Sequence, residues 1–243
     1  MCMSMSSQSL KIEEVDYTED YDWLIILDAC RYDYFVKLWK IGKIEPRLSL
    51  GSCTLEVLSK ISRIPHSVCL TGHPFVLAFR EKFDKVIDAG FNYEIGTCPP
   101  WYMATAFNIF YDKLKRYKRK ILWFLQPHHP LISRPSLMVK IYEDNEGKKL
   151  TPQEKVSLAY RLAKQKGILS KAYRSNLALV LDYVSEIIKR MDGIVVITSD
   201  HGEGLGEPLR PQDKPVFSHP CGREEWELRL IPWCVIDTSE LWW

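Results

Sequence analysis

The sequence predicts a single α/β domain, a three-layer sandwich in which a central, mainly parallel β-sheet is flanked by helices. Two features carry this prediction. Short apolar runs rich in β-branched residues are typical of buried parallel strands, and stretches with helical apolar spacing separate them. A length of 243 residues with 46% hydrophobic residues suits one domain with a full core. We place this domain at residues 19–243 and expect a flexible N-terminus at residues 1–18.

The predicted strands follow from the apolar runs. The runs of the central-strand type are residues 23–27, 121–125 and 194–197. Residues 67–71 and 85–88 are weaker runs of the same kind. Residues 231–236 predict an outer strand, because Pro232 has no N–H group to donate to a neighbouring strand.

Helical patterns lie between these runs. Seven apolar side chains within residues 177–191 step by three and four positions and form one apolar face. Residues 103–117 predict another helix, and the apolar spacing after Thr54 predicts a short one. Thr151 and Pro152 are the residue types expected at the N-cap and first turn of a further helix.

Composition argues against several classes of protein. A formal net charge of +2 names no partner, and no apolar run approaches the roughly 20 residues that span a bilayer. The first residues lack the basic and apolar regions of a secretory signal. Seven cysteines without C-x-x-C spacing argue against a structural zinc site. We therefore expect reduced thiols, a cytoplasmic location and no transmembrane segment.

A cluster of six lysine and arginine residues lies between positions 113 and 120. Clusters of this kind attract nucleic acid or anionic lipid in some proteins. A solvated helix end in front of a strand explains this one more simply. We therefore expect no nucleic-acid partner, and the sequence leaves the oligomeric state open.

The three central runs all end in polar residues that suit a metal site. The first leads into Asp28, the second into a Gln-Pro-His-His stretch that contains His128, and the third into Asp200 and His201. A parallel sheet brings such ends to one edge, where open α/β sheets bind ligands. Carboxylate and imidazole groups bind divalent cations, and a cation offsets repulsion between two carboxylates. An ordinary polar turn explains any one of these endings taken alone.

The turn Gly51-Ser52-Cys53-Thr54 places hydroxyl and thiol side chains directly before the short helix. Backbone N–H groups and the helix dipole favour an oxyanion at a helix start. A bound metal would lower the pKa of a hydroxyl there. Thr54 is therefore a candidate nucleophile, and an N-cap role for Ser52 or Thr54 is the alternative.

Four motifs, in their order along the chain, resemble those of the alkaline phosphatase/sulfatase superfamily. They are Leu-Asp-Ala-Cys-Arg at 27–31, Gly-Ser-Cys-Thr at 51–54, His-His-Pro at 128–130 and Thr-Ser-Asp-His-Gly-Glu at 198–203. The last motif is the most specific. The resemblance covers most of the chain, residues 23–237, and implies an alkaline phosphatase-like fold. It also implies a hydrolase or transferase of phosphate, phosphonate or sulfate esters.

The resemblance gives the metal site and the nucleophile. Asp28, Asp200 and His201 would hold a divalent metal ion (zinc, manganese, magnesium or calcium). Thr54 would also bind this metal and, activated by it, would attack the phosphate ester and form a covalent phospho-threonine intermediate. The pattern is closest to the single-metal transferases with a threonine nucleophile. One metal ion is therefore the prediction, with a second left open.

The resemblance also gives the substrate contacts. His128, and His219 ahead of the last strand, would bind the substrate anion or protonate the leaving oxygen. Arg31 would touch the anion, with an ion pair to Asp33 as an equal alternative. Glu203 would orient a metal-ligand histidine or would simply be a charge at a helix start. The other histidines, at positions 66, 73 and 129, have an ordinary structural or surface role as their simpler interpretation.

The expected substrate is a phosphate or sulfate ester of a small molecule, a glycan or a lipid headgroup. Residues 53–57 lack the Pro/Ala and Arg of the motif that sulfatases convert to formylglycine, which argues against that route. A sulfatase or a phosphodiesterase of the same superfamily is one alternative. A catalytically silent relative that binds an anion or a partner protein is the other.

Overall fold

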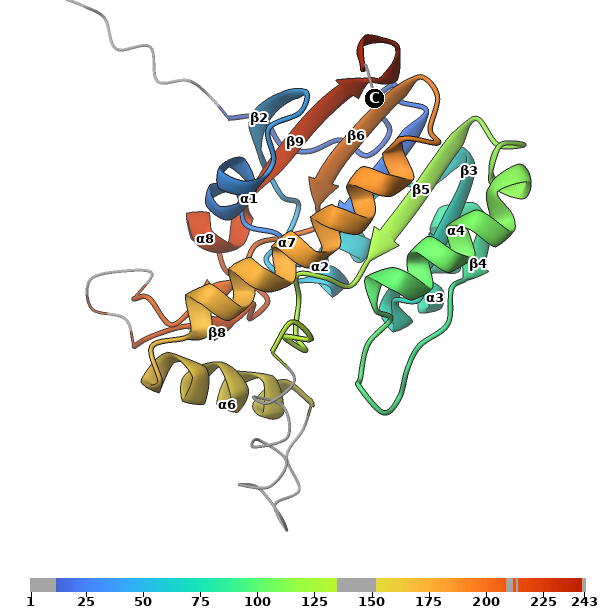
Figure 1. The fold of residues 1–243 in the computed structure, drawn as a ribbon. Coiled ribbons are helices and arrows are strands. Elements are labelled where there is room, and N and C mark those ends of the chain that lie inside the picture. Colours follow the sequence, from blue (N-terminus) through green and yellow to red (C-terminus); the bar gives the residue numbers. More distant parts are fainter. Residues whose placement is uncertain (1–11, 135–151, 209–211, 213, 242–243) are drawn as a thin grey trace, which may run out of the picture.

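A computed structural model of the chain describes residues 12–134, 152–208, 212 and 214–241. Its centre is a seven-stranded sheet of order β2-β9-β6-β1-β5-β3-β4 (Figure 1). The strands are β1 (Trp23–Leu27), β2 (Lys43–Leu48), β3 (Ile64–Thr71), β4 (Phe83–Asp88), β5 (Arg119–Phe124), β6 (Ile194–Ser199) and β9 (Leu230–Asp237). A separate two-stranded sheet pairs β7 (Gly204–Leu205) with β8 (Phe217–Ser218).

The helices are α1 (Tyr32–Leu38), α2 (Thr54–Lys60), α3 (Pro74–Ala78), α4 (Pro100–Leu114), α6 (Pro152–Gln165), α7 (Leu169–Ile188) and α8 (Trp226–Arg229). Two 3₁₀ turns, Arg80–Lys82 and Thr238–Glu240, complete the regular structure of the described residues. None of the helices in this part of the chain has the length and apolar character that crossing a bilayer requires.

The sheet is mainly parallel, as predicted. Strands β6, β1, β5, β3 and β4 run parallel to one another, whereas β9 pairs antiparallel with β6 and β2 pairs antiparallel with β9. The last residue of β1, Leu27, lies opposite Phe124 of β5 and Ser199 of β6. The three central strands therefore end level with one another, and the residues after them meet at one edge of the sheet.

Helices cover both faces of the sheet, which confirms the predicted three layers (Figure 1). On one face, α1, α4 and α7 bury a large apolar cluster that includes Phe35, Phe107 and Val180. On the other face, α2, α3 and the segment before β1 bury a second cluster, with Val57, Val76 and related side chains. All five residues of β1 are buried, as expected of a central strand covered on both sides.

The prediction of an outer strand at residues 231–236 is wrong. Strand β9 lies second from the edge, between β6 and β2. Pro232 faces Pro46 of β2 in the register, and its carbonyl accepts a hydrogen bond of 2.7 Å from the Thr198 hydroxyl. The edge strand β2 went unpredicted, because its charged residues and Pro46 do not form an apolar run.

Two further expectations need correction. Cys53 and Cys221 form a disulfide, so not all thiols are reduced; the cytoplasmic location stays a prediction. The packed body also begins before residue 19, since the side chains of Val15 and Tyr17 are buried. Helix α6 begins at Pro152 as expected, while the N-cap predicted at Thr151 lies outside the described residues.

Candidate active site

The site lies where the central strands end. Asp28 follows β1, and Asp200 and His201 follow β6. All three side chains are almost completely buried, and one ligand atom from each lies within 4.8 Å of the other two. Thr54 comes from a different element, the first turn of α2. The structure thus brings together the four predicted metal-site residues, which lie far apart in the sequence.

Thr54 is at the centre of this group. Its hydroxyl donates a hydrogen bond of 2.9 Å to Oδ2 of Asp200. The same oxygen is 3.1 Å from Nε2 of His201. The hydroxyl therefore contacts two of the three other residues that the sequence assigned to the metal.

His201 presents an unshared electron pair to the site. Its Nδ1 atom lies 2.8 Å from the carbonyl oxygen of Gly202, which can only accept, so Nδ1 carries the proton. The unprotonated Nε2 atom then faces Oδ1 of Asp28 at 3.4 Å and Oδ2 of Asp200 at 3.5 Å. Oδ1 of Asp28 is buried without a hydrogen-bond partner in the described part of the chain.

These atoms fit a divalent metal ion. Two carboxylates and an imidazole electron pair converge, and electron-pair groups that face one another need a cation between them. Burial, followed by the charge of Asp200, raises the pKa of Asp28 to about 7. Burial acts on Asp200 in the same direction, but His201 and the backbone N–H of Ala29 outweigh it and hold the pKa of Asp200 below its usual value.

A second group adjoins the first. The His219 ring lies 4.3 Å from that of His201 and 4.8 Å from that of His128, between centroids. Nδ1 of His219 is 3.2 Å from Oε1 of Glu203. Nδ1 of His128 is buried without a hydrogen-bond partner among the described residues. His128, Glu203 and His219 therefore form a further set with metal-ligand or anion-binding chemistry beside His201.

Glu203 holds His219 in place. Its carboxylate is fully buried and accepts hydrogen bonds from the Tyr160 hydroxyl (3.1 Å) and from Nδ1 of His219. Burial raises the pKa of Glu203 to about 7 and lowers that of His219 to about 4. A carboxylate behind an imidazole orients the ring and directs its Nε2 atom away from the carboxylate. No helix of the described residues begins at Glu203, and the histidine that its carboxylate contacts is His219, which is not one of the four predicted metal ligands.

Gly202 allows the backbone after β6 to approach α8 closely. A Cβ atom at this residue would lie 2.0 Å from the carbonyl oxygen of Glu227. The backbone N–H of Gly202 donates to the carbonyl of Leu228 at 2.8 Å. The absence of a side chain thus lets the segment after β6 pack closely against α8.

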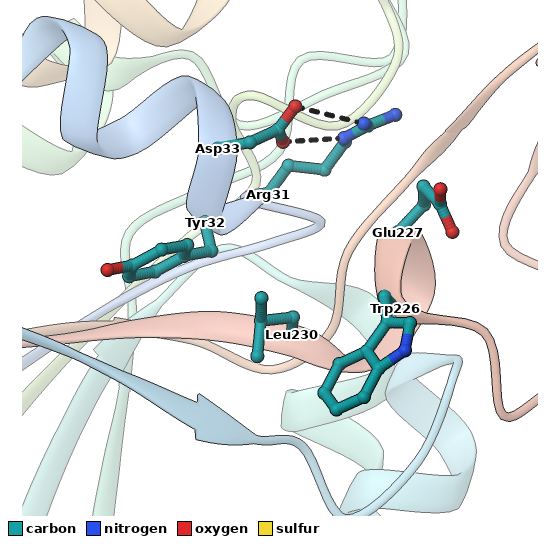
Figure 2. Close-up of a pocket in the computed structure, with 6 residues that line it drawn as sticks. All are labelled: Arg31, Tyr32, Asp33, Trp226, Glu227 and Leu230. Atoms are coloured by element: carbon teal, nitrogen blue, oxygen red, sulfur yellow. Dashed lines mark hydrogen bonds and ion pairs between the residues drawn. The ribbon is translucent and has the colours of Figure 1, made fainter. Parts of the chain in front are cut away.

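Arg31 lies beside the site, engaged with carboxylates. Figure 2 shows its guanidinium facing the Asp33 carboxylate at the edge of a pocket of about 180 Å³, with hydrogen bonds of 2.9 and 3.1 Å. A second ion pair joins it to Glu207, and the Glu203 carbonyl accepts a further hydrogen bond at 3.2 Å. The alternative given for Arg31, an ion pair with Asp33, is the contact that the structure has.

Two features of the site were missed by sequence reasoning. His73, given an ordinary structural role, is buried with Nε2 3.2 Å from Oδ2 of Asp28. The Cys53–Cys221 disulfide ties the Thr54 turn to the segment after His219. A signal for His73 did exist, because it directly follows the β3 run at the same sheet edge. Nothing in the sequence pairs the two cysteines.

The predicted basic cluster lies at the opposite ends of these strands, before β5. Lys115, Lys118 and Lys120 pair with Asp192, Asp20 and Asp22, at 3.3, 3.8 and 3.8 Å. Lys115 and Lys118 are exposed, in line with the interpretation preferred from the sequence, whereas Lys120 is buried in β5.

Comparison with known proteins supports the fold. No protein-family model and no curated protein matches the chain. Among solved structures, the C-terminal periplasmic domain of EptC from Escherichia coli is similar, with a TM-score of 0.52, 12% identity, and coverage of 92% of this chain and 74% of that domain. The same domain in complex with zinc is similar as well, with a TM-score of 0.53.

Two further structures extend the comparison. The lipooligosaccharide phosphoethanolamine transferase A (EptA) of Neisseria meningitidis has a TM-score of 0.55 and 13% identity, over 92% of this chain and 49% of that one. The lipoteichoic acid synthase LtaP of Listeria monocytogenes has a TM-score of 0.51 and 13% identity, over 88% of this chain and 64% of that one. At identities this low, the similarity to these structures shows the fold alone. The chain therefore shares its fold, a mainly parallel sheet flanked by helices, with these EptC, EptA and LtaP structures.

Proposed function

We propose that this protein is a metal-dependent enzyme that hydrolyses or transfers phosphate esters through a covalent phospho-threonine intermediate. The observation that carries the proposal is the position of the Thr54 hydroxyl. It lies within hydrogen-bond distance of Asp200 and His201, at the sheet edge where Oδ1 of Asp28 has no hydrogen-bond partner among the described residues. A nucleophile beside convergent metal ligands is the arrangement that activates an alcohol near neutral pH.

The residues that would hold the metal are Asp28, Thr54, Asp200 and His201, and we propose a single divalent ion there. When bound, such an ion lowers the pKa of the Thr54 hydroxyl and polarises a phosphoryl oxygen. The zinc complex of the similar E. coli domain supports a divalent ion. Zinc, manganese, magnesium and calcium are the ions to test.

Thr54 attacks phosphorus in the first half of the reaction. The Thr54 hydroxyl passes its proton to Asp200, the carboxylate to which it donates, as the bond between Oγ1 and phosphorus forms and the ester P–O bond breaks. Protonated His219 donates a proton to the leaving oxygen. Because Nδ1 of His219 is engaged with Glu203, its Nε2 atom is available for that proton.

The second half releases the phosphoryl group to water or to an alcohol. The Nε2 atom of His219 accepts the proton that the incoming hydroxyl loses, the reverse of its first role. His128, whose ring lies 4.8 Å from that of His219, binds the anion from the other side. Both imidazoles are partly buried, with side-chain exposures of 20% for His128 and 13% for His219, so their contacts with a charged oxygen are stronger than in bulk water.

A phosphate ester of a lipid or glycan headgroup is the substrate class we favour. The similar structures are named phosphoethanolamine transferase and lipoteichoic acid synthase, which supports phosphoryl chemistry. The disulfide gives a further reason to place sulfatase chemistry second. Cys53, the residue that a formylglycine route would modify, is bonded to Cys221.

The experiment is a panel of chromogenic phosphate monoesters, phosphate diesters and sulfate esters with the metal-loaded protein. We expect turnover of a phosphate ester and a loss of about 10³-fold or more in kcat/KM for Thr54→Ala. Ser59→Ala is the matched control, because Ser59 is an exposed hydroxyl on the same helix. Acid quenching and mass spectrometry should find phosphate on Thr54.

Two results would overturn the proposal. One is activity that survives Thr54→Ala, which would exclude Thr54 as nucleophile. The other is no turnover across the whole panel by protein with confirmed bound metal, which would favour the anion- or partner-binding alternative.

A further inference from the structure

His73 is a buried histidine that has no part in the proposed reaction, yet its ring contacts a metal-site carboxylate. It lies just beyond β3, the strand next to β5, and its side chain is about as buried as those of the site. Its Nε2 atom is 3.2 Å from Oδ2 of Asp28. Its Nδ1 atom is 3.1 Å from the backbone nitrogen of Phe75. Both ring nitrogens therefore have a partner.

The contact with Phe75 determines the tautomer of His73. A backbone N–H group can only donate, so Nδ1 must present its unshared electron pair, and the proton of the neutral ring is on Nε2. The Nε2–H group then donates to Oδ2 of Asp28. Metal binding through Nε2 would need the proton on Nδ1, where it would face the N–H of Phe75. The geometry therefore makes His73 a hydrogen-bond donor and not a metal ligand.

His201 has the opposite tautomer, and the two histidines divide the oxygens of Asp28 between them. Oδ2 of Asp28 accepts from His73, while Oδ1 has no hydrogen-bond partner among the described residues. This free oxygen lies 3.4 Å from the unprotonated Nε2 atom of His201. Oδ2 of Asp28 is thus held by a hydrogen bond, and Oδ1 points towards the proposed metal position.

The backbone holds the His73 ring at this place. The N–H of His73 donates to the Thr71 hydroxyl at 3.0 Å, which donates in turn to the Trp123 carbonyl of β5 at 2.9 Å. A Cβ atom at Gly72 would lie 2.2 Å from the Gly90 carbonyl oxygen, so only glycine fits beside His73. The donor is therefore positioned before any ligand arrives.

We propose that His73 is a positioning residue, whose Nε2–H group holds the Asp28 carboxylate so that its other oxygen faces the metal ion. The inference rests on the metal site of the proposed function and not on which ester is the substrate. Removing a neighbour that orients a metal ligand typically costs about 10–100-fold in metal affinity.

Calorimetric titration of the full chain with Zn²⁺ or Mn²⁺ tests this role without any turnover. His73→Leu removes the donor, and we expect its metal affinity to fall about 10–100-fold. His73→Gln keeps an N–H donor at a similar reach and should stay within about 3-fold of the wild type. His129→Leu is the matched control, because it removes a partly buried ring with no hydrogen bond to Asp28, and its affinity should be unchanged.

The tautomer gives a second measurement that needs no variant. Long-range ¹H–¹⁵N NMR of the metal-loaded wild type should show His73 protonated on Nε2 and unprotonated on Nδ1. A proton on Nδ1 would overturn the proposal and make His73 a metal ligand. So would a folded His73→Leu protein with wild-type affinity, or a His73→Gln protein as weak as His73→Leu. A protein that binds metal in this pattern yet turns over no ester would contradict the proposed function alone.

Discussion

The disulfide between Cys53 and Cys221 joins the turn that presents the Thr54 hydroxyl to the segment that carries His219. These two parts of the chain are 168 residues apart in sequence. Glu56 of α2 adds a second link, because its carboxylate accepts a hydrogen bond of 2.6 Å from the backbone N–H of Gly222. The proposed nucleophile and the proposed proton carrier are thus held together by a covalent bond and a charged hydrogen bond.

Loss of this disulfide should destabilise the protein. Cross-links that close long loops restrict the unfolded chain, so we expect Cys221→Ser to lower the free energy of unfolding by about 2–5 kcal/mol. Urea denaturation measures the change. A reductant should lower the stability of the wild type to that of the variant and leave the variant itself unaffected. Alkylation of both Cys53 and Cys221 in the non-reduced native protein would contradict the cross-link.

Asp28 should make the stability of the metal-free protein depend on pH. Its pKa is raised from 3.8 to about 7, so the folded state binds this proton more tightly than the unfolded state does. The stability that the proton supplies is complete below about pH 4 and is lost as pH rises to about 7. Asp28→Asn removes this titration. We therefore expect the metal-free variant to gain thermal stability over the wild type between pH 5 and pH 8, measured in chelator.

Glu203 supplies the control for that measurement, since its pKa is also raised to about 7. Glu203→Gln should remove its own share of the pH dependence and leave the share of Asp28. Added metal should stabilise the wild type more at pH 8 than at pH 5, because protons compete for Asp28 at the lower pH. The same loss of stability with pH in Asp28→Asn as in the wild type would contradict the assignment to Asp28.

The sequence predicted the parts of the fold that packing dictates. A strand such as β1, buried on both faces, must be apolar throughout, so it can be predicted from its apolar sequence. The edge strand β2 need not be apolar throughout. Its residues Lys43, Glu45 and Pro46 interrupt the apolar pattern, so the strand was not predicted. The inner position of β9 was missed for a related reason, because Pro232 rules out one backbone hydrogen bond and not a neighbouring strand.

Some residues of the site could also be predicted from the sequence, and others could not. Asp28, Asp200 and His201 could be grouped from sequence, because parallel strands end at one edge. The role of His73 depends on which ring nitrogen faces the Phe75 N–H, a relationship that exists only after folding. The disulfide depends on two segments that meet in space without any shared pattern. Local periodicity in a sequence therefore predicts where strands end. It does not predict contacts between side chains that are far apart along the chain.

Glu203 should affect the protonation step through His219. Glu203→Gln keeps a side chain of the same shape but removes the charge that stabilises a protonated ring, so we expect kcat to fall about 10²-fold. The loss should be larger for an alkyl phosphate than for a nitrophenyl phosphate, because a poor leaving group depends more on proton donation. Steady-state kinetics on the two esters measures the difference.

Tyr160→Phe is the comparison for that prediction. It removes the 3.1 Å hydrogen bond to the other carboxylate oxygen but leaves the charge behind His219 intact. Its effect on kcat should be smaller and should not depend on the leaving group. Equal losses for both esters in Glu203→Gln would show that the carboxylate supports folding of the site and not proton transfer.

Arg31 should matter for stability more than for substrate binding. Its guanidinium is largely buried and is shared between Asp33 and Glu207. Arg31→Met leaves these carboxylates without their partner, so we expect a loss of about 3 kcal/mol in unfolding free energy. KM should change less than about 3-fold, because the cation is already neutralised and has little attraction left for a substrate anion. Denaturation and steady-state kinetics on one preparation separate the two effects.

The exposed ion pair between Arg63 and Asp84 provides the matched control. Arg63→Met should cost no more than about 1 kcal/mol, since solvent screens exposed pairs. If Arg31→Met instead raised KM 10-fold or more at unchanged stability, Arg31 would exchange its carboxylates for the substrate anion on binding. Glu207→Gln would then lower KM by freeing the guanidinium, whereas the structural role predicts that it lowers stability and leaves KM unchanged.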